Sequence, residues 1–149
     1  MDSDRQRETL QITEINGQAW TYTQKTGELE HDGEPIGTGY SGCGEGKNNP
    51  EMQSVHNIGP VPKGNWTISG PPVNTPQHGP YVLRLTPRSE TETFGRSGFL
   101  IHGDSKAAPG TASQGCIILA RPMREKVWES GDRDLEVVAE LPLTSDEKK

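Results

Sequence analysis

The sequence is short of cysteine, of histidine in metal-binding spacing and of long apolar runs, and each absence excludes a class of protein. Two cysteines in 149 residues are too few for a disulfide-stapled scaffold or a structural zinc site. The four histidines are scattered and form no HExxH or similar motif, so we expect no metal and no cofactor. No apolar stretch approaches the ~20 residues of a membrane-spanning helix, so we expect no membrane insertion.

Positive charge and hydrophobic residues are also scarce. The 15 basic residues are outnumbered by 21 acidic ones, and without a basic stripe we expect no nucleic acid as the main partner. The first residues, 1–5, lack an apolar segment, which predicts that there is no secretory signal peptide. Hydrophobic residues make up only 29% of the chain, but they cluster in short runs between turns, as in a folded protein. We therefore expect one domain over 1–149, with a core of about 8–143 and a charged tail at 144–149.

Turn residues divide the chain into short predicted strands. An alternating stretch at 10–15 is followed by Asn16 and Gly17, a pair typical of a two-residue hairpin turn. One helix is predicted over 121–128, because Pro122 suits a first helical turn and Gly131 can end the helix. A proline-rich stretch at 70–80 is predicted to be a turn. The sequence thus favours a mainly β fold with one helix, whose other predicted strands cover residues 19–24, 28–31, 65–69, 81–86, 98–101, 116–119 and 135–141.

A long polar segment at 37–64 is rich in glycine and has few residues that could anchor it by burial. Long irregular segments in compact domains are usually functional or disordered. Within it, Asn49 and its neighbours at 47–48 either face a substrate or form an exposed turn.

One pair of residues offers reactive chemistry. His102 ends the clearest predicted strand, and Cys116 follows a glycine-containing loop. A thiol becomes a good nucleophile when a nearby imidazole takes its proton, and backbone N–H groups at Gly115 and Cys116 could stabilise an oxyanion. Acyl transfer through a thioester is therefore possible. Two other interpretations stay open: a structural, buried Cys116, and a disulfide between Cys116 and Cys43.

The block from His102 to Cys116 resembles the L,D-transpeptidase (YkuD-type) catalytic domain. That family has His-Gly, a loop, and then Ser/Thr-His-Gly-Cys; here the residues are His102 and Gly103, then the run at 113–116. The upstream run at 39–64, with Tyr40 near its start, is similar to the L,D-transpeptidase-like effectors of type VI secretion systems. The resemblance covers roughly 37–128 and implies a β-sandwich of mixed sheets, with one short helix after the catalytic cysteine.

The resemblance implies roles for individual residues. Cys116 matches the nucleophile and His102 the general base, while Gly103 stands where a backbone carbonyl or a small side chain orients the histidine. Ser113 and Gly115 match the loop around the thiolate. Gln114 departs from the pattern, because the motif has a second histidine there and a glutamine cannot act as a base.

Other polar residues have more than one interpretation. Asp104 either tunes His102 or opens the turn that follows it. Substrate carboxylates would need cations, although most of the candidates are expected to be solvated surface charges. These candidates are Arg84, Arg88, Arg96, Lys106 and Arg121.

The resemblance also implies a target, partners and a location. Its expected substrates are peptidoglycan stem peptides, in particular tetrapeptide stems, with water or a free D-amino acid as acceptor. An effector of this kind passes from the producer's cytoplasm through the type VI machinery to the periplasm of a target cell, and it has a cognate immunity protein. The alternative is a non-catalytic module on the same fold that binds peptidoglycan or a protein, with Gln114 marking lost chemistry.

Overall fold

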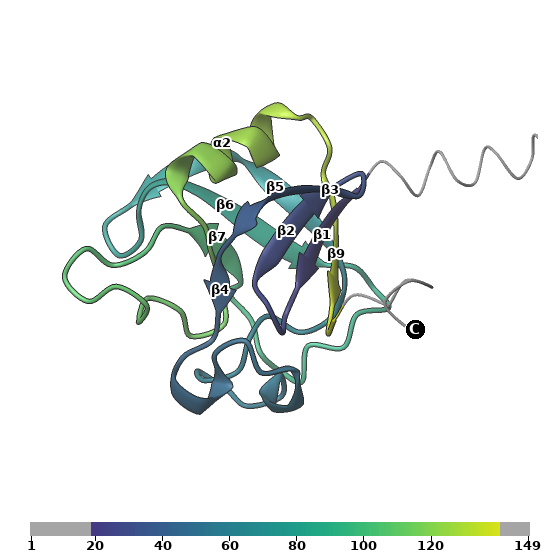
Figure 1. Ribbon diagram of the computed structural model, residues 1–149, viewed down its shortest axis with the longest axis vertical. Coiled ribbons are helices and arrows are strands. Elements are labelled where there is room, and N and C mark those ends of the chain that lie inside the picture. Colours follow the sequence, from purple (N-terminus) through teal and green to yellow (C-terminus); the bar gives the residue numbers. More distant parts are fainter. Residues whose placement is uncertain (1–18, 141–149) are drawn as a thin grey trace, which may run out of the picture.

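A computed structural model describes residues 19–140 as one curled β-sheet with a single α-helix packed against it (Figure 1). The predicted mainly β fold, with mixed strand pairing and a short helix after the cysteine, is confirmed. The predicted strand at 10–15, its turn and the charged tail at 144–149 lie outside the described residues. The elements are β1 (Trp20–Thr23), β2 (Glu28–His31), β3 (Glu34–Thr38), β4 (Tyr40–Ser41), the 3-10 helices η1 (Gly44–Gly46) and η2 (Pro50–Met52), β5 (Gly64–Thr75), β6 (Gly79–Pro87), β7 (Leu100–His102), β8 (Ile117–Ile118), α2 (Arg121–Glu129) and β9 (Asp134–Val138).

The strands form one hydrogen-bonded sheet in the order β3-β2-β1-β9-β5-β6-β7-β8-β4. The pairs β1–β9 and β7–β8 are parallel and the others are antiparallel. Its two edge strands, β3 and β4, are separated in the chain by Gly39 alone, and they run on as one ribbon in Figure 1. The sheet must therefore curl until its edges meet, and its two halves enclose a common core as the layers of a sandwich do.

The core lies inside this curl and is rich in aromatic and β-branched residues. Trp66 packs edge-on against Phe99, with ring centroids 5.0 Å apart. The helix α2 packs against the sheet through the buried Val127. The ring of Trp128 lies so close to Gly70 that a Cβ atom on that residue would be 2.3 Å from the ring. No helix within residues 19–140 has the length and apolar character needed to cross a membrane. The other buried hydrophobic residues include Trp20, Tyr22, Leu29, Ile68, Leu83, Ile101, Ile117, Leu119, Leu135 and Val137.

The structure corrects several predicted boundaries. The segment at 70–80 is mostly strand: β5 continues to Thr75 and pairs with β6, which begins at Gly79, so the turn is limited to residues 76–78. The β5–β6 register shifts between Ser69 and Val73, and Pro71 and Pro72 lie at this irregularity. Their missing N–H groups therefore interrupt no regular ladder of hydrogen bonds. The last strand ends at Val138 rather than at 141.

Candidate active site

The cleft of about 1080 Å³ opens beside the parallel pair β7–β8. His102 is the last residue of β7 and pairs with Ile118, while Cys116 immediately precedes β8, so the two residues flank the same short parallel pair. Both side chains line the cleft, together with Gly103, Gln114 and Gly115. The His-Gly and Gly-Cys parts of the motif therefore meet in one site.

The imidazole of His102 is held in one tautomer. Its Nδ1 lies 2.8 Å from the Gly103 carbonyl oxygen, which can only accept, so Nδ1 carries the proton. The ring is 2% exposed, and Nε2 is buried without a hydrogen-bond partner among the described residues. Burial lowers the pKa of His102, and the charges of His78 and Arg124 lower it further, against the opposing effect of the Gly103 hydrogen bond. The lone pair of Nε2 is thus available as a base at neutral pH.

The thiol of Cys116 is partly buried, and its sulfur lies 3.8 Å from the Gly98 carbonyl oxygen. Burial raises the pKa of the Cys116 thiol, while a hydrogen bond from the Leu100 N–H and the positive charge of Arg96 act to lower it. The resting pair is therefore a neutral thiol and a neutral imidazole, and an attack by sulfur requires proton transfer. Cys43 is also free, so the disulfide alternative does not describe this structure.

Arg96 is buried near Cys116 and is 7% exposed, which the sequence did not indicate. Its Nη1 donates to the carbonyls of Gln53 and Pro60, and its Nη2 to those of Gly59 and Gln114. The guanidinium thereby ties the segment before β5 to the loop before Cys116. It also places a positive charge where a thiolate would form.

Arg124 is a second buried cation, 5% exposed, on the opposite flank of the motif. Its Nε donates to the Leu119 carbonyl, and its Nη1 donates to the carbonyls of Pro80 and Tyr81. The sequence analysis missed this residue. A signal was present, because Arg124 lies three positions before Val127 and so falls on the buried face of the predicted helix.

The positions of Arg96 and Arg124 explain why the motif has glycine at residues 103 and 115. A Cβ at Gly103 would lie 2.8 Å from Nη2 of Arg124, and a Cβ at Gly115 would lie 2.5 Å from Nη2 of Arg96. Gly115 also has a φ of +136°, a conformation that disfavours every residue with a side chain. Each glycine therefore makes room for a guanidinium next to a reactive side chain.

Ser113 is fully buried and holds the loop before Cys116 in place. Its Oγ donates to the Cys116 carbonyl (2.6 Å) and accepts from the N–H groups of Gly42 (2.8 Å) and Gly115 (3.0 Å). The Gly115 N–H that the sequence suggested for an oxyanion is thus engaged by Ser113, which leaves the Cys116 N–H as the nearest candidate. Gln114 is exposed at the cleft wall, where the motif has its second histidine.

Tyr40, Asn49 and Asp104 support the walls rather than meet at the reactive pair. The Tyr40 hydroxyl donates to Asp104 Oδ1 (2.7 Å) and accepts from the Ala112 N–H (2.9 Å), which fastens the loop after His102 to β4. Asn49 caps η2, since its Oδ1 accepts from the Glu51 N–H. The structure does not bring Tyr40 or Asn49 into the lining of the cleft, whereas Asp104 is part of it.

Two further histidines, His56 and His78, line the cleft. His78 lies with its ring centroid 4.4 Å from that of His102, and His56 lines the wall near Phe94, whose carbonyl is 3.1 Å from its Nε2. No sequence motif predicted these two positions, because each histidine lies in a turn that is far from His102 and Cys116 in the sequence.

The expectation of no metal stays a prediction. Among the described residues, the ligand atoms of His31, Asp32 and Asp132 lie within 4.8 Å of one another. This group is not part of the cleft, and His31 is already engaged there. Its Nε2 is 3.1 Å from Asp132, and its ring stacks on Trp20.

Fold and site together define a class: a mainly β protein with a cysteine and a base-competent histidine at the ends of adjacent parallel strands. The sequence model of the Tlde1 domain matches residues 36–139, which is more than half of the chain. The chain therefore belongs to the Tlde1 family, the L,D-transpeptidase effector family of type VI secretion. The resemblance inferred from the sequence is confirmed at the level of the family.

The structure is also similar to the crystal structure of Mycobacterium tuberculosis L,D-transpeptidase 1, with 21% sequence identity and a TM-score of 0.40. The match covers 80% of this chain and 60% of the mycobacterial chain, so this chain spans well under two thirds of that protein. The comparison with curated protein sequences gave no significant match.

Proposed function

We propose that this protein is an antibacterial enzyme that removes or exchanges the terminal D-residue of peptidoglycan stem peptides through a Cys116 thioester. The observation that carries the proposal is the His102 imidazole, fixed by Gly103 with a buried, unpartnered Nε2 in the same cleft as the Cys116 thiol. An unsatisfied buried nitrogen costs stability, and its presence in a cleft that also contains a thiol favours a chemical role. Membership of the Tlde1 family supports peptidoglycan as the target.

In the first half-reaction, Nε2 of His102 takes the thiol proton as the sulfur attacks the amide carbonyl between the L-centre of the diamino acid and the D-residue. A carbon–sulfur bond forms, and the Cys116 N–H donates to the resulting oxyanion. When the carbon–nitrogen bond breaks, His102 returns the proton to the departing amine. The D-residue leaves as a free amino acid, and the thioester remains.

In the second half-reaction, His102 takes a proton from the nucleophile that attacks the thioester. Attack by water releases the shortened stem as a carboxylic acid, which is an L,D-carboxypeptidase reaction. Attack by the amine of a free D-amino acid forms a new amide, which is an L,D-transpeptidase exchange. In both cases the carbon–sulfur bond breaks and the proton returns to Cys116.

The biological setting follows from the family. Tlde1 effectors are delivered by type VI secretion. We expect this protein to act in the periplasm of the target cell, and we expect the producing cell to hold an immunity protein that blocks the cleft. Expression directed to the periplasm without that partner should then be toxic, and toxicity should depend on Cys116.

Mass spectrometry of purified muropeptides with tetrapeptide stems tests the chemistry. Wild-type protein should remove the terminal residue, or replace it when a D-amino acid is added, and Cys116→Ala should do neither. Cys43→Ser is the matched control, since it removes the other thiol and should keep activity. If no mass change occurs while the Cys116 thiol reacts normally with an alkylating probe, the chain is the non-catalytic binding module instead.

A further inference from the structure

We infer that Arg124 and Arg121, at the start of α2, bind the free α-carboxylate of the terminal D-residue. The site would thereby select the ends of stem peptides over internal amides. This inference rests on the proposed function, and it assigns the start of α2 to the carboxylate at the end of the stem peptide.

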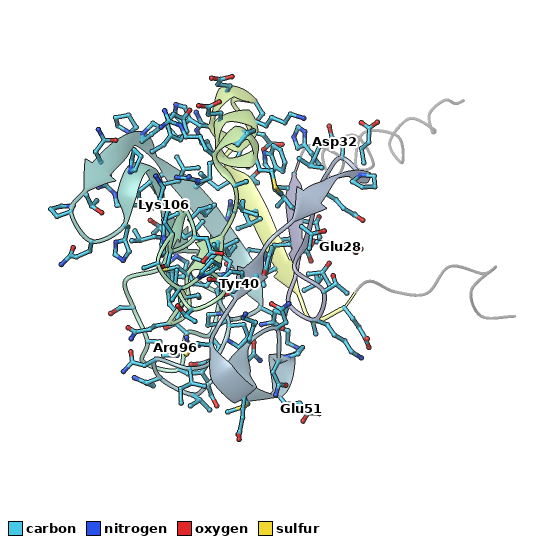
Figure 2. The ribbon with its side chains drawn as sticks, turned by 60° about the vertical axis from the view of Figure 1, so that its left-hand side comes forward. Glu28, Asp32, Tyr40, Glu51, Arg96 and Lys106 are labelled. Atoms are coloured by element: carbon cyan, nitrogen blue, oxygen red, sulfur yellow. The ribbon has the colours of Figure 1, made fainter. Side chains whose placement is uncertain are left out.

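The charge of the cleft is opposite to that of the protein. The chain carries a formal net charge of −6, yet four cations line the cleft: Arg96, Lys106, Arg121 and Arg124. Among the described residues, Asp104 is the one carboxylate in this lining. The acidic residues Glu28 and Asp32 lie on the far side of the molecule from Lys106 and Arg96 (Figure 2). A cationic hollow in an acidic protein favours an anionic ligand.

The carboxylate in the lining makes no ion pair with these cations in the part of the chain that the structure describes. Asp104 accepts from the Tyr40 hydroxyl and from the N–H groups of Ser105 and Gly110. Partial burial acts to raise the pKa of Asp104, but these hydrogen bonds hold it below its usual value, so the carboxylate is already satisfied.

Arg124 has an unused donor. Three of its contacts go to carbonyls through Nε and Nη1, whereas Nη2 has no acceptor within residues 19–140 and lies against Gly103. Although Arg124 is only 5% exposed as a whole, Nη2 is not one of the fully buried unpartnered atoms, so this nitrogen reaches the cleft that Arg124 lines and can donate to a ligand there. Arg96 differs, since both of its terminal nitrogens already donate to carbonyls. Arg124 is therefore the buried cation that is free to bind a ligand.

The position of Arg124 matches the departing residue rather than the acyl side. His102 protonates the leaving amine, and Gly103, against which Nη2 of Arg124 lies, is the next residue. In an α-amino acid the carboxyl carbon is two bonds from the amine nitrogen. A group that binds this carboxylate must therefore lie close to His102, on the flank away from Arg96 and Cys116.

The start of α2 supplies the second cation and a favourable dipole. Ala120 is the N-cap of this nine-residue helix, makes no side-chain cap hydrogen bond and lines the cleft. Arg121 also lines the cleft and is oriented by Glu125 (2.9 Å) and by the Tyr81 ring, 4.9 Å away. Partial positive charge at a helix N-terminus adds to the attraction for a carboxylate.

The test compares two substrates that differ only at the terminal group. Tetrapeptide stems that end in a free acid or in the corresponding carboxamide are cleaved by the wild-type protein, and kcat/KM is measured for each. Loss of a charge-assisted contact predicts a value about 10- to 100-fold lower for the carboxamide. Arg121→Gln, at an exposed position, should lower the ratio of kcat/KM for the free acid to kcat/KM for the carboxamide. Arg124→Lys should lower the same ratio if the variant retains its fold. Lys126→Gln, exposed on the same helix and outside the cleft, should leave the ratio unchanged.

The outcomes separate this inference from the proposed function. Equal cleavage of acid and carboxamide by the wild-type protein would overturn the carboxylate site while the enzyme activity stands. A ratio that Arg121→Gln leaves unchanged would overturn the role of that residue. Absence of cleavage of either substrate by correctly folded protein would overturn both proposals.

Discussion

At the scale of the residue, burial determines the protonation of the reactive pair. Burial disfavours the charged form of both groups, so it raises the pKa of Cys116 and lowers that of His102. Both groups in the cleft are therefore favoured in their neutral forms, and in the proposed mechanism charge develops only during attack. Arg96 and the Leu100 N–H are the groups placed to stabilise the sulfur at that moment.

This resting state predicts a specific pH dependence. A general base works when it is unprotonated, so kcat/KM should rise with pH through the pKa of His102. Because burial lowers that pKa, the acid limb should lie below pH 6.5. A pH profile of stem-peptide cleavage measures it. Alkylation of Cys116 by iodoacetamide in a Cys43→Ser background is the comparison, and it should rise only at alkaline pH. An acid limb above pH 6.5 would contradict the assignment of a buried neutral base.

The motif glycines give a second prediction at this scale. Gly115→Ala should lower the free energy of unfolding, because the new Cβ meets Arg96 and the positive φ alone costs about 1–2 kcal/mol. Gly131→Ala is the control, since it has a φ of +79° with nothing within 4 Å of the new Cβ. Urea titration of both variants should show the larger loss for Gly115→Ala. Equal losses would mean that Arg96 moves aside without cost.

Part of the site could be predicted from single residues. His102 and Cys116 stand at strand ends within a motif, and such local patterns can be recognised without the fold. The cations beside them could not be assigned, because Arg96 reaches the site through a loop and Arg124 through a helix face. Their burial depends on packing between residues that are far apart in the sequence, and local periodicity does not predict such packing.

At the scale of the element, the same distinction applies to the strands. β1 alternates apolar and polar residues, and turn residues on either side of β1 and β2 were the signals that predicted the two strands. β3 is polar and contains a proline, and β4 has only two residues. These strands exist because β2 and β8 offer backbone partners, so pairing rather than propensity defines them.

The loop between β7 and β8 is the element on which the site depends, and it projects from the sheet in Figure 1. The Tyr40 hydroxyl fastens it through Asp104 and Ala112. Tyr40→Phe should therefore speed amide hydrogen exchange at 104–112 and lower kcat/KM, with little change in the rest of the sheet. Tyr81→Phe is the matched control, since it keeps the ring on which Arg121 stacks. Unchanged exchange in the loop would show that Tyr40 does not hold it.

At the scale of the whole molecule, charge is segregated between the cleft and the remaining surface. An acidic protein with a cationic cleft should attract anionic stem peptides over a distance set by ionic strength. We expect kcat/KM for stem peptides to fall as salt rises. Alkylation of Cys116 by the neutral reagent iodoacetamide should change little under the same conditions. A cleavage rate that does not depend on salt would argue against electrostatic attraction of the substrate.

The place of β9 in the sheet has a consequence for how the protein folds. β9 is the last described strand along the chain, yet it lies between β1 and β5 near the middle of the sheet. Until residues 134–138 have been synthesised, no strand fills the place between β1 and β5, and the two groups of strands are linked through β4, which follows β3 and pairs with β8. Such non-local pairing slows folding and couples it to late steps. A ribosome would therefore complete His102 and Cys116 before the strand that closes the described sheet between β1 and β5 is available.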